Sequence, residues 1–567
     1  MLFSLLTDRR KLAYGVAFCV LLAWIVGIVA LVAKTGCSHQ DDMPWDTMIL
    51  LDGAYRVHTG QMPHVDYLSP TGAFPFWLAS LGMTLGGVNA NALAYGMVLG
   101  FVCVTLLAWG VCARRFSAVF ALALALLAGG LMIATRPLAF GLLWYSWEFA
   151  HASYAMGYNR IGWALLCILA VVWLLPPAKR EGFHAAEAAE SLLAGCLTVV
   201  LALTKINYLA AALAIGFAGL VLTRGGWRRV LWYVAGLAVI PVLLWTLSSF
   251  SFRAYLGDIA TVGRLADSGE RLMRMARVFA GNLGEMLLVV ATYGLLRPFF
   301  GKAGTVRMAV LCGGCVAVGW AVLALNTQWR EIPLLAVACA ILLETALRSG
   351  VAPDGPGGEA FRFRFLLGAA FFFFLFGRTF LSDSASVGYS WAVKNHMRYS
   401  TPDSALFQTE SLSPMLLPPQ GGEQVERPRV VAELLERRSF SPSVAGRLSL
   451  TPYQYAHLVN DGVALLQPHV NAASRVFCMD SANPFPLALR LPAPKGGALW
   501  WDKMTFNRKI FPAPERALGE VTHVMLPKSG VDSEAVWEVY GPYVTEHFRH
   551  VAASELWDLY VRKEPLE

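Results

Sequence analysis

The sequence predicts a mainly α protein: a polytopic bundle of about eleven membrane-spanning helices, followed by a small extracytoplasmic α/β domain. The 567 residues are 56% hydrophobic and only 15% charged, with a mean hydropathy of +0.52, whereas a soluble domain has about 25% charged residues. The charge also divides at residue 381: residues 1–381 hold 28 Lys/Arg and 18 Asp/Glu, a net charge of +10, and residues 382–567 hold 18 and 20, a net charge of −2. This composition excludes a disordered chain, which needs many more polar residues.

The predicted spans are the apolar stretches between compact Lys/Arg clusters. Such clusters mark the cytoplasmic side of membrane helices, so the chain must cross and return between successive clusters, although several stretches are shorter than the roughly 20 residues that a span prefers. The stretches are 12–33, 92–112, 117–134, 160–175, 189–205, 207–222, 230–247, 285–297, 307–325, 332–347 and 365–381. The first lacks a small-residue cleavage site and is predicted to be a retained helix. We therefore expect a multi-pass protein of the inner (plasma) membrane, with a cytoplasmic N-terminus and an external C-terminal domain.

Most of the polar chemistry lies in the first external loop, residues 34–87. It holds five carboxylates (Asp41, Asp42, Asp46, Asp52 and Asp66) and three histidines (His39, His58 and His64). Two amphipathic pieces, residues 45–59 and 71–85, are too short or too polar to cross and are expected to lie along the membrane surface. The acidic groups would then meet the headgroup boundary, where a lipid-linked phosphate presents itself.

Two further external segments carry charge. Residues 135–159 are rich in aromatic residues and contain Glu148. Residues 248–284 contain several arginines, of which Arg271, Arg274 and Arg277 would share a helical face. That face is either solvated and in contact with lipid headgroups, or a site for a lipid phosphate.

Residues 382–567 are predicted to form the separate C-terminal domain. Helices are expected at 430–438, 453–466 and 534–548, and strands at 475–479, 498–502, 522–526 and 557–562, an alternation typical of a small α/β layer. The domain has neither a Gly-rich phosphate loop nor a nucleophile elbow. It is interpreted as a lid, an acceptor-docking domain or a scaffold.

The first external loop resembles a pattern of GT-C type membrane glycosyltransferases, a group that includes lipid A aminoarabinose transferases and protein O-mannosyltransferases. The pattern is Asp52-Gly-Ala-Tyr55, then Gly60, Pro63, Asp66 and Ser69-Pro70, followed by Phe74-Pro-Phe-Trp77. The resemblance implies a many-helix membrane domain with an external C-terminal domain. It also implies transfer of a sugar from a polyprenyl phosphate donor, with an acidic residue of this loop as base. Many relatives have Asp-Glu where this chain has Asp52-Gly53.

The chemistry of such a transfer needs a base and a cation. A carboxylate within hydrogen-bond reach takes the proton of the attacking hydroxyl, and a single carboxylate without a second as nucleophile implies inversion. Asp52 is the first candidate for the base; its alternative role is a helix cap or an ion pair with Arg56. Asp41, Asp42 and Asp66 are the other candidates, Asp66 also being interpreted as a turn residue.

A cation must stabilise the departing lipid phosphate. Lys205 lies between two apolar runs at the expected outer end of a span, where an ionisable residue is a functional candidate by default; its alternative is to extend toward the headgroups. Arg330 and Arg378 are further candidates of the same kind. The substrate cavity is expected to be lined by Tyr55, His64, Glu148 and Arg160.

No cofactor and no metal site are predicted. His39 and His64 could join Asp41 and Asp42 around a divalent ion, but the loop has no tight ligand spacing. The Cys312-Gly-Gly-Cys315 pair lies in an apolar helix without a second pair and is interpreted as helix packing.

The expected partners are a lipid-linked sugar donor, membrane lipids and a glycan, lipid or protein acceptor of the cell envelope. No basic run with interleaved aromatic residues is present, so nucleic acid is not an expected partner. Three alternatives stay open beside the glycosyltransferase: a polymerase or ligase of polyprenyl-linked saccharides, a flippase of the same lipids, and a non-catalytic assembly subunit.

Overall fold

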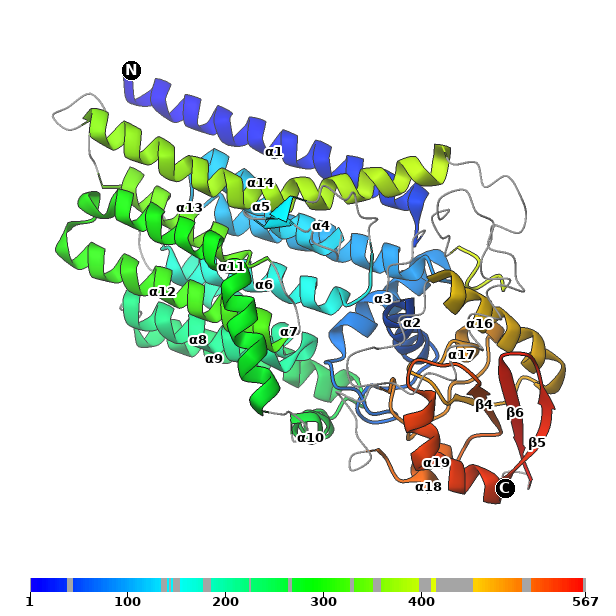
Figure 1. Ribbon diagram of the computed structural model, residues 1–567. Coiled ribbons are helices and arrows are strands. Elements are labelled where there is room, and N and C mark those ends of the chain that lie inside the picture. Colours follow the sequence, from blue (N-terminus) through cyan, green and yellow to red (C-terminus); the bar gives the residue numbers. More distant parts are fainter. Residues whose placement is uncertain are drawn as a thin grey trace.

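Helices dominate the computed structural model (Figure 1). It describes residues 2–37, 44–133, 140–141, 144–145, 153–176, 185–223, 226–263, 268–326, 331–349, 358–396, 409–414, 452–501 and 511–563. The predicted class, a mainly α membrane helix bundle with a small C-terminal α/β region, is confirmed.

Each of the eleven predicted spans coincides with a helix of the bundle. Helices suit these apolar runs because they satisfy every backbone hydrogen bond within the segment, as a hydrocarbon environment requires. The helices are α1 (Leu2–Thr35), α4 (Ala92–Cys112), α5 (Ala118–Ile133), α6 (Gly157–Leu174), α7 (Ala185–Thr204), α8 (Ile206–Thr223), α9 (Trp227–Leu247), α11 (Ser268–Leu296), α12 (Gly301–Leu325), α13 (Leu334–Leu347) and α14 (Gly358–His396).

Eight helices of the described chain are long and apolar enough to cross a membrane by length and composition. The helices α5, α8 and α13 are apolar but shorter. Almost every residue of α5 and α13 is buried, so other helices cover these two instead of lipid. The helix α14 has 39 residues and continues past residue 381.

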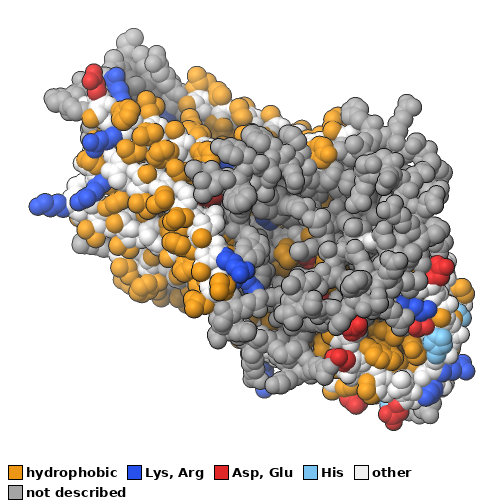
Figure 2. All heavy atoms as spheres, viewed as in Figure 1, with side chains coloured by type: hydrophobic (Ala, Val, Ile, Leu, Met, Phe, Trp, Pro, Cys, Tyr) orange, Lys and Arg blue, Asp and Glu red, His pale blue; other side chains and the backbone are white. Residues whose placement is uncertain are grey.

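Basic residues gather at the end of the bundle that lies away from the C-terminal domain. Arg115, between α4 and α5, pairs with Glu190 of α7 across 2.5 Å. Arg348, after α13, donates a hydrogen bond to the carbonyl of Pro176, after α6, at 3.0 Å. Figure 2 shows Lys and Arg side chains at this end and a broad apolar surface over the neighbouring helices. The ends predicted to be cytoplasmic therefore lie together, and the side of the membrane that they face stays a prediction.

The first external loop folds into two helices at the opposite end of the bundle, α2 (Pro44–His58) and α3 (Phe74–Gly86) (Figure 1). They coincide with the two pieces predicted to be too short or too polar to cross. Between them, the backbone N–H of Gly72 donates to the carbonyl of Thr204 at 3.1 Å. A Cβ atom at Gly72 would lie 1.8 Å from the carbonyl oxygen of Leu203. The loop therefore packs directly on the end of α7.

The C-terminal domain is built on one four-stranded sheet with the order β3-β4-β6-β5. The pair β3–β4 is parallel, and the other two pairs are antiparallel. The strands are β3 (Val476–Cys478), β4 (His523–Pro527), β5 (Phe548–Ala553) and β6 (Trp557–Arg562), and the helices are α16 (Pro452–Leu466), α17 (Phe485–Leu489), α18 (Pro514–Leu518) and α19 (Ser533–His547). Three further elements lie outside the C-terminal domain. They are the two-residue strands β1 (Phe140–Gly141) and β2 (Trp144–Tyr145) and a surface helix, α10 (Phe252–Gly263).

Most elements predicted for the C-terminal domain are present. The strands at 475–479, 522–526 and 557–562 and the helices at 453–466 and 534–548 are confirmed. The strand predicted at 498–502 is wrong: Ala498 forms an isolated bridge to Leu68 of the first external loop and joins no sheet. The helix predicted at 430–438 lies outside the described residues. The edge strand β5 was not predicted because half of its residues are exposed and its side chains give no alternating pattern.

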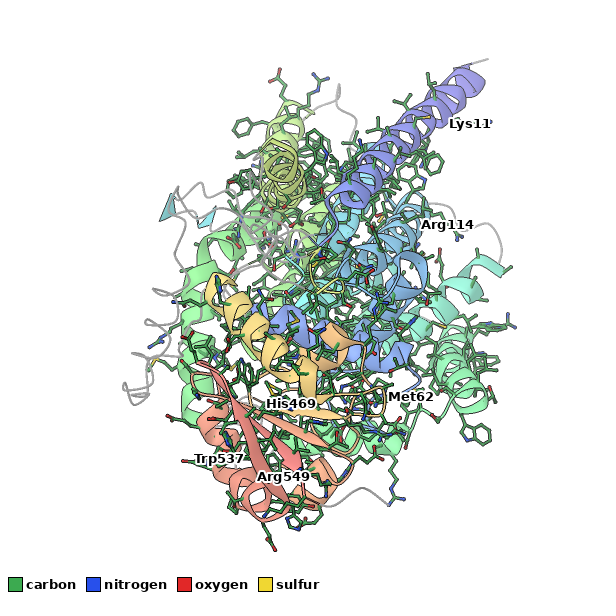
Figure 3. All side chains as sticks on the ribbon, turned by 90° about the vertical axis from the view of Figure 1, so that its right-hand side faces the viewer. Lys11, Met62, Arg114, His469, Trp537 and Arg549 are labelled. Atoms are coloured by element: carbon green, nitrogen blue, oxygen red, sulfur yellow. The ribbon has the colours of Figure 1, made fainter. Side chains whose placement is uncertain are left out.

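The C-terminal domain is joined to the first external loop by backbone hydrogen bonds. The N–H of Leu68 donates to the carbonyl of Gly497, and the N–H of Leu499 donates to the carbonyl of Leu68, both at 2.9 Å. The N–H of Gly496 donates to the carbonyl of Asp66 at 2.7 Å. We call residues 493–499 the docking segment. Figure 3 looks from the side of the C-terminal domain and shows Met62 of the loop beside it.

The close approach at Gly72 makes a stability prediction. Gly72→Ala should destabilise the protein by about 1–3 kcal/mol, because the added methyl group forces the loop and α7 apart. Gly110→Ala in α4 is the control, since a Cβ atom there meets nothing within 4 Å. Thermal unfolding in detergent measures both variants, and equal midpoints would contradict the packing of the loop on α7.

Candidate active site at the first external loop

Asp52 and Arg56 form a buried ion pair on α2. They are four residues apart and so lie on one face of the helix. The Nε of Arg56 lies 2.9 Å from Oδ2 of Asp52, and the side chains are 5% and 1% exposed. The alternative role predicted for Asp52, an ion pair with Arg56, is therefore formed. A role as base is compatible with this pair only if the second carboxylate oxygen is available.

The second carboxylate oxygen of Asp52 takes no part in the ion pair. Its Oδ1 is buried and has no hydrogen-bond partner in the part of the chain that the structure describes. The hydroxyl groups of Tyr67 and Tyr455 are also buried and have no partner among the described residues. Burial raises the pKa of Asp52, and the adjacent Arg56 guanidinium opposes this increase. Asp52 thus has one oxygen fixed by Arg56 and one oxygen without a described partner, on a carboxyl group whose pKa is raised.

Arg56 connects this carboxylate to the C-terminal domain. Its Nη1 donates to the carbonyl of Pro494 in the docking segment at 2.6 Å. Its guanidinium also lies over the ring of Tyr67, 5.3 Å from the centroid. Gln61 adds a parallel contact, because its amide donates to the carbonyl of Ala493 at 2.6 Å. A pocket lies beside Arg56 and is lined otherwise by residues of the C-terminal domain, including Cys478, Asn483 and Trp501.

Asp66 lies in the turn after α2. Its Oδ2 accepts a hydrogen bond from the N–H of Met62 at 2.7 Å, and its Oδ1 lies 2.9 Å from Nζ of Lys495 in the docking segment. Both oxygens are therefore occupied, unlike those of Asp52. The arrangement matches the interpretation of Asp66 as a turn residue.

Tyr55 and His64 both lie in the first external loop, Tyr55 in α2 and His64 in the turn that follows it. A substrate cavity that they share with Arg160 stays a prediction. Tyr55 is buried on α2, and burial raises its pKa, with a further increase from Asp52. His64 adopts φ 70° and its Nδ1 lies 2.8 Å from Oδ2 of Asp258 in α10. His64 thus ties the first external loop to the third external segment.

Lys205 interrupts the chain between α7 and α8, next to the first external loop. Its Nζ lies 5.1 Å from the centroid of the Tyr158 ring. Burial lowers the pKa of Lys205 to about 8, and the carboxylate of Asp46 at the start of α2 opposes this decrease. Because Gly72 contacts the adjacent Thr204, the loop, the membrane helices and this cation meet at one place.

The arginine candidates are held by carboxylates. Arg160 of α6 pairs with Glu331 at 2.7 Å and with Asp383 of α14. Arg378 of α14 pairs with Glu285 of α11. Neither arginine is therefore an uncompensated cation of the kind that a phosphate site needs.

Four predicted site residues, Asp41, Asp42, Glu148 and Arg330, lie outside the described residues, as does His39. Within the described ranges, no group of three or more His, Cys, Asp or Glu residues could hold a metal ion. The absence of a metal site in the whole loop stays a prediction.

Sequence reasoning missed several partners of the site residues. Asp258, Glu285 and Asp383 were not predicted to belong to the site. Asp383 could have been predicted, because it follows the last apolar stretch and an ionisable residue near the membrane is a functional candidate. The docking segment could not be recognised in the sequence, because most of its contacts are made by backbone N–H and carbonyl groups, which almost any residue supplies.

The sequence matches no protein-family model and none of the curated proteins. Among solved structures, the chain is similar to ArnT from Cupriavidus metallidurans bound to undecaprenyl phosphate, with 13% sequence identity and a TM-score of 0.45. The similarity covers 96% of this chain and 97% of that chain. At this identity and TM-score it assigns neither a family nor a function.

The buried ion pair makes a second stability prediction. Arg56→Met should cost about 3–5 kcal/mol, because it leaves the Asp52 carboxylate buried without a counter-charge. The double variant Asp52→Asn/Arg56→Met should cost less than the sum of the single variants, with a coupling of about 1–3 kcal/mol. Unfolding in detergent measures the cycle. Additive costs would show that the two side chains do not interact.

Proposed function

We propose that this protein is a membrane glycosyltransferase that moves a sugar from a polyprenyl phosphate donor to a hydroxyl group of an envelope acceptor. The proposal rests on the hydrogen bonding of the two carboxylate oxygens of Asp52. One oxygen is fixed by Arg56, and the other is buried without a partner in the described part of the chain. This carboxylate stands in the motif that resembles GT-C enzymes.

Asp52 would act as the general base. A carboxylate whose pKa is raised by burial is a better proton acceptor than an exposed one. Arg56 holds its orientation, so that Oδ1 faces the incoming hydroxyl without rotation. With one carboxylate as base and no second carboxylate as nucleophile, the sugar would be transferred by single displacement with inversion.

Lys205 would bind the donor phosphate. It lies where two membrane helices meet the first external loop, and the ring of Tyr158 lies beside its ammonium group. Arg378 is neutralised by Glu285 and is the weaker candidate, while Arg330 keeps its place as a candidate from the sequence. We place this site on the extracytoplasmic side of the inner membrane, since the basic clusters lie at the other end of the bundle.

The C-terminal domain would control access of the acceptor. Asp52 is 1% exposed, and the docking segment lies on Arg56 and on the loop beyond it. An acceptor can reach Asp52 only when the docking segment moves. The pocket beside Arg56 is the place where such an opening would begin.

The direct test is Asp52→Asn. The amide cannot take a proton, so kcat for sugar transfer should fall by about 10²–10⁴-fold. Purified protein in nanodiscs is supplied with a panel of undecaprenyl phosphate sugars and envelope extract, and lipid-linked and acceptor-linked sugar are separated by mass spectrometry. Asp66→Asn is the matched control and should keep activity within a few-fold.

Three results would contradict the proposal. Undiminished transfer by Asp52→Asn would remove Asp52 as the base. Movement of the intact lipid-linked sugar across the membrane without transfer would favour the flippase. Joining of whole lipid-linked saccharides, and not single sugars, would favour the polymerase or ligase.

The phosphate site makes a pH prediction. Lys205 is protonated below its pKa of about 8, so affinity for undecaprenyl phosphate should fall as the pH rises through and above 8. Lys205→Arg stays charged up to pH 10 and should lose this dependence. Binding is measured by fluorescence quenching in nanodiscs between pH 6 and 10. The same pH dependence in both proteins would exclude Lys205 as the phosphate ligand.

A further inference from the structure

A second polar group lies inside the helix bundle and takes no part in the proposed roles of Asp52 and Lys205. Nη1 of Arg160 lies 2.7 Å from Oε2 of Glu331, and its Nη2 pairs with Oδ1 of Asp383. These side chains are at most 4% exposed. We call these three residues the Arg160 triad. They come from α6, from the segment before α13 and from α14.

The charge of the triad does not balance. Two carboxylates face one guanidinium, which leaves a formal charge of −1 in a buried place. Burial of charge is costly unless each charge is paired, and one carboxylate would be enough to neutralise Arg160. A purely structural ion pair therefore does not account for the second carboxylate.

Several atoms of the triad are also unpartnered. Oε1 of Glu331, Oδ2 of Asp383 and Nε of Arg160 are buried and have no hydrogen-bond partner within the described ranges. The neighbouring Asn159 is 1% exposed, and both atoms of its amide group lack a partner there too. A buried polar atom without a partner costs about 1–3 kcal/mol. So many of them in one place indicate a ligand that supplies the missing hydrogen bonds.

The unpartnered atoms identify the chemistry of that ligand. Carboxylate oxygens accept hydrogen bonds, Nε of arginine donates one, and the amide of Asn159 does both. An anion would be repelled by the net charge of −1, and the guanidinium already lies between the two carboxylates, where a metal ion would have to lie. Hydroxyl groups both donate and accept, so a polyhydroxylated, uncharged group fits this set.

The triad is close to the proposed phosphate site. Tyr158, which contacts Lys205, precedes Asn159 and Arg160 in the chain. The hydroxyl of Tyr208, on the helix that follows Lys205, donates to the carbonyl of Asn159 at 2.6 Å. A ligand with a phosphate at Lys205 could therefore extend its next group toward the triad.

We propose that Glu331 and Asp383, held by Arg160, form a subsite for the sugar hydroxyl groups of the donor. The subsite deepens the proposed function and rests on it. The carboxyl groups would accept hydrogen bonds from hydroxyl groups, and Arg160 would act as a positioning residue that keeps both of them oriented. The affinity of the donor would then have two separable parts, the phosphate at Lys205 and the sugar at the triad.

The test compares binding of undecaprenyl phosphate with binding of a panel of undecaprenyl phosphate hexoses, pentoses and N-acetylhexosamines in nanodiscs. The wild-type protein should bind at least one sugar-bearing lipid more tightly than undecaprenyl phosphate. In Asp383→Asn and Glu331→Asp, the affinity for that sugar-bearing lipid should fall by roughly tenfold or more. Their affinity for undecaprenyl phosphate should stay within twofold of the wild-type value. Glu331→Asp keeps the carboxylate and shortens the side chain by one methylene group, so it tests the subsite even if Asp383→Asn does not fold.

Glu190→Gln is the matched control. It alters another buried Arg–Glu pair, at the opposite end of the bundle, and should leave both affinities unchanged. If the triad variants keep the gain from the sugar, or lose both affinities equally, the subsite is wrong. If the wild-type protein binds undecaprenyl phosphate but gains nothing from any sugar, the subsite fails while the phosphate site stands. If it binds none of these lipids, the proposed function itself fails.

Discussion

The Asp52–Arg56 ion pair is the contact on which the architecture of the external face depends. Arg56 is bonded on one side to the carboxylate of Asp52 and on the other to the carbonyl of Pro494 in the docking segment. Since both side chains are buried, neither can lose its partner without leaving a charge away from water, which costs several kcal/mol. The pair therefore couples the position of the C-terminal domain to the orientation of Asp52, and it leaves the other carboxylate oxygen without a partner in the described part of the chain.

The membrane imposes the second constraint. In hydrocarbon, backbone groups must be satisfied within helices, and charged side chains must be paired or lie near water. The chain meets these conditions by confining its basic clusters to one end of the bundle and its acidic loop to the other. Near that second end, the ammonium group of Lys205 lies beside the ring of Tyr158 and interacts with the charge of Asp46, whereas Arg160 and Arg378 are paired with carboxylates. This difference is why we propose Lys205, and not Arg160 or Arg378, as the phosphate ligand.

Much of the fold could be predicted from the sequence because lipid leaves a strong compositional signal. Apolar runs and basic clusters identified all eleven bundle helices, and the two short helices of the first external loop followed from their polarity. The strand predicted at 498–502 was wrong because an extended segment has the same sequence pattern whether it joins a sheet or bridges a distant loop. Ala498 stands opposite Leu68 in an isolated bridge, whose hydrogen bonds are made by Gly497 and Leu499. The helix-spaced pair of Asp52 and Arg56 was visible in the sequence. Contacts between residues far apart, such as His64 with Asp258 or Arg160 with Asp383, depend on helix packing that no local pattern contains.

In the proposed mechanism, a single carboxylate, that of Asp52, takes the acceptor proton while the lipid phosphate departs. The anomeric configuration of the product tests this claim most directly, because single displacement inverts the anomeric carbon and a covalent sugar–enzyme intermediate retains it. Nuclear magnetic resonance of the product formed from an undecaprenyl phosphate sugar of known configuration gives the answer. The mechanism predicts inversion. Retention would require a second nucleophile at the site and would contradict the role assigned to Asp52.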